Sequence, residues 1–156
     1  NARNEREIVR LADACRRTGH EFLFEIVTGN NGKATAPDQV LALMRRYYDL
    51  GVAPDWWKLE PVEDAGFWTA AGDIVRANDP HLQGIIVLGK EMPEEDLGRG
   101  LAMARTEPLV NGFAIGRTIF SKAAQAWFAG EIDDAAAQDM MTAVYGQLIE
   151  AWDSAV

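Results

Sequence analysis

Cysteine, long apolar runs and membrane-targeting signals are scarce or missing, and each shortage narrows what the protein can be. Cys15 is the single cysteine, so no disulfide can form within the chain, which fits a reducing compartment. No apolar run approaches the ~20 residues of a membrane-spanning helix. No cationic start precedes a short apolar stretch, as it would in a secretory signal. We therefore expect a cytoplasmic protein with no membrane partner.

The chain also has fewer basic residues than acidic ones. The formal net charge is -9 and the pI is near 4.7. Because binding to nucleic acid requires clustered lysine and arginine against the phosphates, this balance disfavours a nucleic-acid partner. A few converging donors can still bind a small anion. The sequence has no close pair of histidines, no cysteine cluster and no glycine-rich nucleotide loop, so we expect neither a metal nor another cofactor.

Short apolar runs alternate along the chain with segments of helical periodicity. Dense apolar or aromatic runs predict strands at 20–27, 55–60, 84–89 and 111–116. Helices are predicted at 4–17, 37–50, 63–77, 94–105, 118–129 and 133–154, with Asp133 as an N-cap. Strand followed by helix, four times, is typical of parallel βαβ units, and near-continuous apolar strands fit a sheet covered on both faces. No linker divides residues 1–156, which we expect to form one domain.

Two parallel architectures compete: a small doubly wound sheet and part of a (β/α)8 barrel. In the last strand, one face holds small residues, Gly112, Ala114 and Gly116, while large residues occupy the other. Small residues pointing inward suit a crowded barrel wall. A complete barrel takes about 250 residues. The sequence therefore predicts the C-terminal half of a (β/α)8 TIM barrel, with four parallel strands each followed by a helix.

Half a barrel leaves two strand edges unpaired and its interior uncovered. We expect a homo-oligomer, or a missing N-terminal barrel half, to close it. The chain begins with Asn1 in a helical pattern rather than with Met, which is consistent with a piece of a longer polypeptide.

The stretch DWWKLEP, residues 55–61, places one ammonium group in the most aromatic part of the chain. Strand alternation puts Lys58 and Glu60 on one face, and Glu25 of the preceding strand faces the same interior. A free lysine amine, with a pKa of about 10.4, is protonated at neutral pH, but burial disfavours the ammonium. The neutral amine can form a Schiff base with a ketone, with Glu25 or Glu60 transferring protons. The alternative is a structural ion pair between Lys58 and one of these glutamates.

Glycine turns follow the last two strands. Gly116 and Arg117 stand where a helix begins, so backbone amides and a guanidinium converge there. Gly89 and Lys90 follow the preceding strand, and barrels commonly bind a phosphate between these two loops. The alternatives are a helix-capping surface arginine and a solvated loop lysine. The loop TGNNGKATA, residues 28–36, is either a substrate loop or an ordinary connection.

The blocks GHEFLFEIV, PDWWKLEP, GIIVLG, GFAIGRTIF and AWFAGEID span nearly the whole chain. Their order resembles the aldolase domain of 5-dehydro-2-deoxyphosphogluconate aldolases of inositol catabolism, often fused behind a sugar kinase. It is also similar, more distantly, to class I tagatose-bisphosphate aldolases.

The resemblance implies a (β/α)8 barrel whose Schiff-base lysine, on strand six, falls on Lys58. The strand-five glutamate of the tagatose relatives falls on Glu25, and phosphate contacts fall on Gly89, Gly116 and Arg117. The implied lyase reaction splits 5-dehydro-2-deoxygluconate 6-phosphate into dihydroxyacetone phosphate and malonate semialdehyde without a metal. Two alternatives stay open: a non-catalytic phosphosugar-binding or interaction domain on the same scaffold, and an aldolase for another ketose phosphate.

Overall fold

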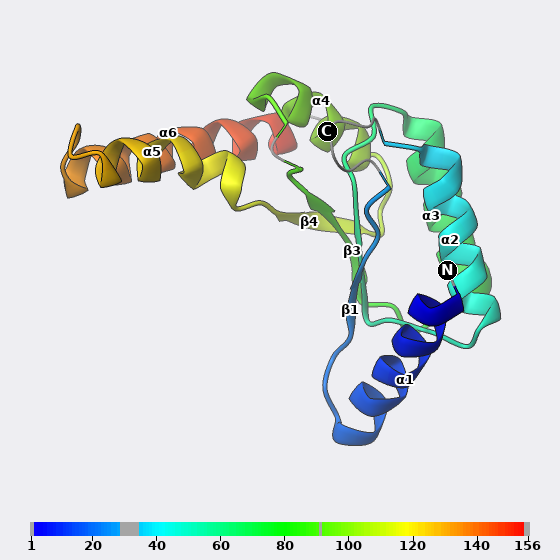
Figure 1. The fold of residues 1–156 in the computed structure, drawn as a ribbon. Helices are drawn as coiled ribbons and strands as arrows, with labels where there is room; N and C mark the ends of the chain where they lie inside the picture. The colour runs from blue at the N-terminus through cyan, green and yellow to red at the C-terminus, as the bar shows by residue number, and fades with distance from the viewer. Residues whose placement is uncertain (1, 29–34, 91, 155–156) are drawn as a thin grey trace.

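The structure, a computed structural model, describes residues 2–28, 35–90 and 92–154. Within these ranges, four parallel strands alternate with helices (Figure 1). The strands are β1 (Leu23–Glu25), β2 (Trp56–Leu59), β3 (Gly84–Leu88) and β4 (Val110–Ala114). The helices are α1 (Ala2–Thr18), α2 (Pro37–Asp49), α3 (Ala65–Asn78), α4 (Glu94–Ala104), α5 (Arg117–Phe128) and α6 (Asp134–Asp153). The predicted alternation of strands and helices is confirmed.

The helices begin and end close to where the sequence predicts them. Pro37 opens α2, where its missing amide hydrogen costs no intrahelical bond. The Asp133 carboxylate accepts a hydrogen bond from the Ala136 amide at 2.9 Å, which confirms the predicted N-cap of α6. The strands are shorter than the apolar runs that predicted them. Strand β1, for example, includes only three residues of the run 20–27.

The strands lie side by side in the order in which they occur in the sequence, β1-β2-β3-β4, and every neighbouring pair is parallel. Glu25 pairs with Lys58, Lys58 with Ile86, and Ile86 with Gly112. A doubly wound sheet reverses its strand order at a switch point, and this order has no such reversal over its four strands. The register places residues from all four strands in one row across the sheet.

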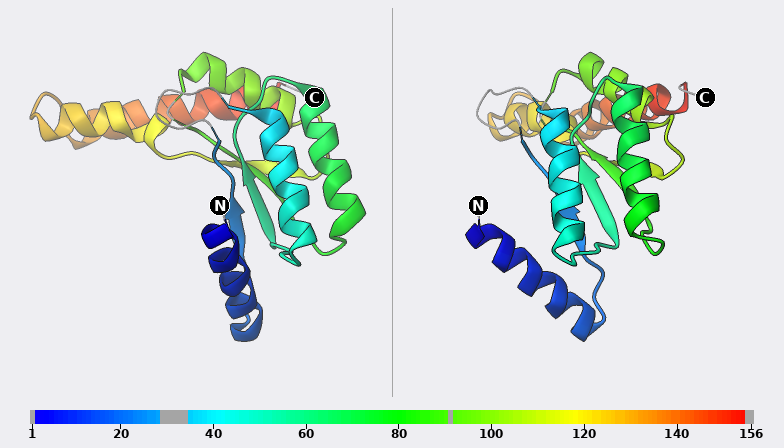
Figure 2. Two further views of the ribbon diagram at one scale, coloured as in Figure 1. Left: turned by 45° about the vertical axis from the view of Figure 1, so that its right-hand side comes forward. Right: turned by 90° about the vertical axis from the view of Figure 1, so that its right-hand side faces the viewer.

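One face of the sheet carries the hydrophobic core. Helices α2 and α3 lie side by side along this face (Figure 2). Trp57 and Leu59 of β2 are fully buried there, and Trp57 stacks on Phe24 with ring centroids 5.1 Å apart. The indole nitrogen of Trp57 donates a hydrogen bond to the Tyr48 hydroxyl at 2.8 Å. Burying each large apolar side chain contributes about 1.5–3 kcal/mol, which fixes this face of β2 inward.

The opposite face of the sheet is more open. Because side chains alternate along a strand, residues next to the buried ones point to this face. Leu23 is 45% exposed, and Glu25 and Ala114 are exposed as well. None of the described helices lies along this face in Figures 1 and 2. The sequence predicts a sheet covered on both faces, whereas the described helices cover one, so the ionisable residues of the other face are accessible.

Helices α5 and α6 form a hairpin that extends beyond the sheet (Figure 1). The end of α6 returns to β4, where the Phe113 ring lies 6.0 Å from Trp152 and 6.2 Å from Tyr145, centroid to centroid. The Arg105 guanidinium, at the end of α4, lies over the Trp152 ring at 5.0 Å. These contacts hold β4, and with it the start of α5, against the rest of the sheet.

Candidate functional site

Lys58 and Glu25 are neighbours on the open face of the sheet. They are register partners on β2 and β1, and Lys58 Nζ lies 3.7 Å from Glu25 Oε1. The Lys58 side chain is 21% exposed and the Glu25 side chain 43% exposed. The structure thus brings together the predicted amine and carboxylate, with the amine largely shielded and the carboxylate open to a ligand.

Glu60 is placed differently from its prediction. Strand β2 ends at Leu59, two residues before the buried Pro61, so the alternation that would align Glu60 with Lys58 no longer applies. The Glu60 side chain is fully buried. Its Oε2 accepts hydrogen bonds from the Thr28 amide at 2.9 Å and the Thr28 hydroxyl at 2.6 Å. Glu60 therefore joins the end of β2 to the segment that follows β1.

Lys90 supplies the counter-charge of Glu60. Its Nζ lies 2.8 Å from Glu60 Oε1 and donates a hydrogen bond to the Thr35 hydroxyl at 2.8 Å. The side chain is 17% exposed, so the alternative of a solvated loop charge does not hold. The backbone of Lys90 has φ 52°, a left-handed conformation that is uncommon outside glycine. A buried charge is stable only when it is paired and hydrogen-bonded, and both partners here meet that condition.

Gly89 brings the loop after β3 against the start of α5. A Cβ at this position would lie 2.7 Å from Ile115 Cγ2 and 3.3 Å from the Thr118 hydroxyl. The first distance is below van der Waals contact, so the close approach depends on glycine. The two predicted phosphate loops, after β3 and after β4, are therefore adjacent.

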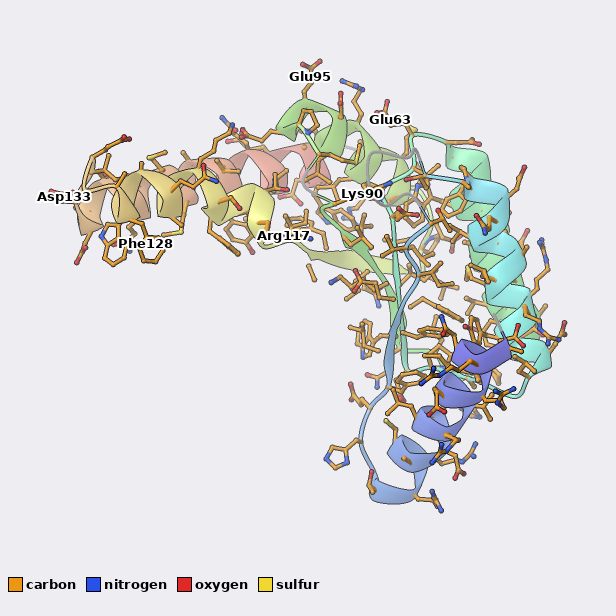
Figure 3. The ribbon with its side chains drawn as sticks, in the orientation of Figure 1. Glu63, Lys90, Glu95, Arg117, Phe128 and Asp133 are labelled. Carbon is orange, nitrogen blue, oxygen red and sulfur yellow. The ribbon has the colours of Figure 1, made fainter. Side chains whose placement is uncertain are left out.

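The first residues of α5 present several hydrogen-bond donors. Gly116 is the N-cap and has no side chain to satisfy the amides of the first turn. Arg117, the first helical residue, is exposed, and Figure 3 labels it at the start of α5. The Thr118 hydroxyl oxygen is buried and has no hydrogen-bond partner among the described residues.

Thr118 is a residue that the sequence reasoning missed. The sequence predicts a helix from 118, and the helix begins at Arg117, which places Thr118 in its first turn. The motif GFAIGRT does carry the threonine directly after Gly116 and Arg117. No feature of the local sequence indicates that its hydroxyl lies next to Gly89, because that contact joins two different strand ends.

The whole chain, residues 1–156, matches the model of a bacterial family described as "Uncharacterized protein conserved in bacteria (DUF2090)". The chain belongs to DUF2090. No curated protein matches it. The DUF2090 description states no reaction, so the chemistry of this member has to be argued from its own residues.

Neither a metal-ligand cluster nor a membrane-spanning helix occurs among the described residues of this DUF2090 member. In the ranges 2–28, 35–90 and 92–154, no group of three or more His, Cys, Asp or Glu residues is arranged to hold a metal ion. Among the helices described, none is both long and apolar enough to cross a membrane. Residues 29–34, most of the candidate substrate loop, lie outside the described residues, and Thr28 and Thr35 flank them.

The DUF2090 site thus consists of three groups at the carboxyl ends of parallel strands, where such folds place their ligands. Lys58 and Glu25 form an ion pair and face the open side. The fully buried Glu60 pairs with Lys90, which is 17% exposed. The turn at Gly89 and the start of α5 offer donors that suit an anion, because the amino end of a helix carries a partial positive charge.

Proposed function

We propose that the chain belongs to a class I aldolase that cleaves a phosphorylated keto sugar acid. The proposed substrate is 5-dehydro-2-deoxygluconate 6-phosphate, and the products are dihydroxyacetone phosphate and malonate semialdehyde. The observation that carries this proposal is the pair on the open face: a lysine that is 21% exposed, with a glutamate oxygen 3.7 Å from its nitrogen.

The chemistry uses both members of this pair. When Glu25 takes a proton from the ammonium, the neutral Lys58 amine attacks the ketone carbon, and loss of water leaves an iminium ion. A carboxylate then removes the proton of the hydroxyl on the carbon two positions from the iminium carbon. The bond between that hydroxyl-bearing carbon and the carbon next to the iminium breaks. Its electrons flow into the iminium and give an enamine, while malonate semialdehyde leaves. Protonation of the enamine and hydrolysis release dihydroxyacetone phosphate and restore Lys58.

Glu25 is the stronger candidate for these proton transfers. Its carboxylate is exposed on the same face as Lys58, so a bound ligand can reach it. Glu60, the other predicted proton carrier, is fully buried and bonded to Thr28 and Lys90.

The phosphate of the substrate would bind at the turn after β3 and the start of α5. Gly89 permits the close approach, while Gly116, Arg117 and the Thr118 hydroxyl supply donors. Lys90 was also predicted to contact the phosphate. Glu60 and Thr35 engage its ammonium, so this contact has less support than the others.

We further propose that the fold is the C-terminal half of a (β/α)8 barrel. Sequential parallel order and helices on one face of the sheet are both features of such a barrel. The open face would then be the barrel interior, closed either by an N-terminal half or by a second copy of the chain. Intact mass and light scattering on the purified protein distinguish the two: a mass far above 17.2 kDa per chain indicates further chain, and a doubled assembly of 17.2 kDa chains indicates a dimer.

A cleavage assay tests the reaction. The complete protein is incubated with a panel of keto sugar phosphates, and release of dihydroxyacetone phosphate is followed with a coupled dehydrogenase. We expect release from the proposed substrate, its loss in Lys58→Met, and a kcat lowered roughly 100-fold or more in Glu25→Gln, in line with general acid–base catalysis. Full activity of Lys58→Met would refute the mechanism, and release from another member of the panel would replace the substrate.

A non-catalytic phosphosugar-binding domain is the second candidate. The Lys58–Glu25 ion pair favours it, because a carboxylate 3.7 Å away stabilises the ammonium rather than the nucleophilic amine. Binding of the sugar phosphate by calorimetry, with no cleavage by the wild-type protein, would support this candidate.

A further inference from the structure

Four residues form a polar cluster around the fully buried Glu60, two positions after the proposed Schiff-base lysine: Thr28, Thr35, Glu60 and Lys90. We call it the Glu60–Lys90 cluster. The cluster joins three segments of the chain. Thr28 and Thr35 belong to the connection between β1 and α2, Glu60 follows β2, and Lys90 follows β3. Figure 3 labels Lys90 at these strand ends. The Thr28 hydroxyl also accepts a hydrogen bond from the Ala36 amide at 3.0 Å, next to the start of α2.

The charge of Glu60 matters to Lys58 because the two residues are two positions apart on the same segment. A carboxylate close to a lysine stabilises the ammonium form, and burial strengthens the effect because water does not screen it. Glu60 accepts two hydrogen bonds from Thr28, and such donors favour a carboxylate over the protonated acid. Without a counter-ion, Glu60 would therefore oppose formation of the neutral amine that a Schiff base requires.

The residues in the same row of the sheet as Lys58 carry no positive charge. The partner of Lys58 on β1 is Glu25, an acid, and its partner on β3 is the apolar Ile86. Gly112 of β4, next in the row, carries no charge. The charged residues of α4 engage one another and its neighbours at the surface, where Arg99 pairs with Glu63, Glu95 and Asp96, and Glu94 with Lys122. Arg117 is exposed at the start of α5.

We propose that Lys90 is a positioning residue: its ammonium neutralises buried Glu60 and ties together the ends of β1, β2 and β3, so that Lys58 faces a pair without net charge. The proposal rests on the proposed aldolase function, and it gives Glu60 and Lys90 a joint role that neither proton transfer nor phosphate binding describes. The left-handed backbone of Lys90 fits this role, since the pair stabilises a conformation that lysine seldom adopts.

The test measures how pH controls Schiff-base formation. The complete protein is incubated with dihydroxyacetone phosphate and borohydride between pH 5.5 and 10, and the pH of half-maximal trapping is determined by mass spectrometry. Lys90→Met removes the cation that pairs with Glu60, so we expect this midpoint to rise by about one pH unit. Glu60→Gln leaves the Lys90 cation, so the midpoint should fall by a similar amount. In the double variant both charges are gone, and the midpoint should return to within ~0.3 pH units of wild type.

Two controls separate charge from folding. Lys122→Met removes a lysine that is 79% exposed and pairs with Glu94, and it should leave the midpoint unchanged. Lys90→Arg keeps the charge and should stay near wild type if it folds, which circular dichroism verifies for every variant. If the substitutions acted only through lost packing, the midpoint of the double variant would differ from that of wild type at least as much as the midpoints of the single variants do.

Three results would overturn the proposal. Equal midpoints in Lys90→Met and wild type exclude the charge effect. A double variant that keeps the midpoint of Lys90→Met shows that Glu60 is not the group that Lys90 compensates. Wild-type protein that forms no adduct at any pH removes the aldolase function and this inference with it, whereas the first two results leave the aldolase function standing.

Discussion

Replacement of Gly89 by alanine should destabilise the protein and weaken binding of phosphate. The added Cβ would lie 2.7 Å from Ile115 Cγ2 and 3.3 Å from the Thr118 hydroxyl. Ile115 is β-branched, so its Cγ2 cannot turn away without leaving its preferred rotamer. Overpacking of this kind costs about 1–3 kcal/mol. The expected response is a displacement of Ile115 and of the start of α5, where the proposed phosphate donors lie.

Urea unfolding measures the first part of this prediction. With a slope of about 2 kcal/mol per molar urea, within the range typical of small proteins, the loss corresponds to a midpoint lower by about 0.5–1.5 M. Gly146→Ala is the matched control, because Gly146 lies inside α6 and no atom lies within 4 Å of the added Cβ. This control should raise stability by roughly 0.5–1 kcal/mol, since alanine favours a helix.

Phosphate binding measures the second part. Calorimetry with dihydroxyacetone phosphate should give a weaker affinity for Gly89→Ala than for wild type, and an unchanged affinity for Gly146→Ala. A Gly89→Ala protein with wild-type stability would show that the turn after β3 is looser than the close approach to Ile115 indicates. Normal stability together with normal affinity would also remove Gly89 from the phosphate site.

Three further predictions concern single contacts. Thr118→Val should weaken binding of dihydroxyacetone phosphate about 3- to 10-fold in calorimetry, the effect of one hydrogen bond, while Thr118→Ser retains it; equal affinities would exclude the hydroxyl. Asp133→Ala removes the N-cap of α6 and should cost about 1 kcal/mol in urea unfolding, and an unchanged midpoint would contradict the cap. Hydrogen bonds from Arg46 lower the pKa of the Glu5 carboxyl. The pair therefore stabilises the docking of α1 at pH values above the pKa that Glu5 has in the unfolded chain. This contribution is lost as the pH falls through the lower pKa that Glu5 has in the folded protein. Glu5→Gln should therefore increase hydrogen exchange in α1 at pH 7 and increase it less at pH 3, and an equal increase at both pH values would refute this.

The sequence predicts most of the fold because local patterns determine it. Helical periodicity, Pro37 and Asp133 locate the helices to within a few residues. Strand alternation correctly places Lys58 and Glu25 on one face, since both lie within regular strands. These features depend on residues that are close together along the chain.

The predictions that changed depend on contacts between distant segments. Glu60 pairs with Lys90, 30 positions further on, and no local pattern links them. Strand β2 was expected to align Glu60 with Lys58, but it stops at Leu59. The Glu60 side chain therefore turns into the cluster at the strand ends. The Thr118 hydroxyl becomes part of the site through the turn at Gly89. Sequence patterns predicted the residue types of the site, and the tertiary contacts determine which of them act together.

The identity of the lysine that captures a ketone tests the account most directly. The complete protein is incubated with dihydroxyacetone phosphate and borohydride, digested, and mapped by mass spectrometry. We predict one reduced adduct, on Lys58, and its absence in Lys58→Met. An adduct on Lys90 or any other lysine, or none at all, would contradict the proposed mechanism.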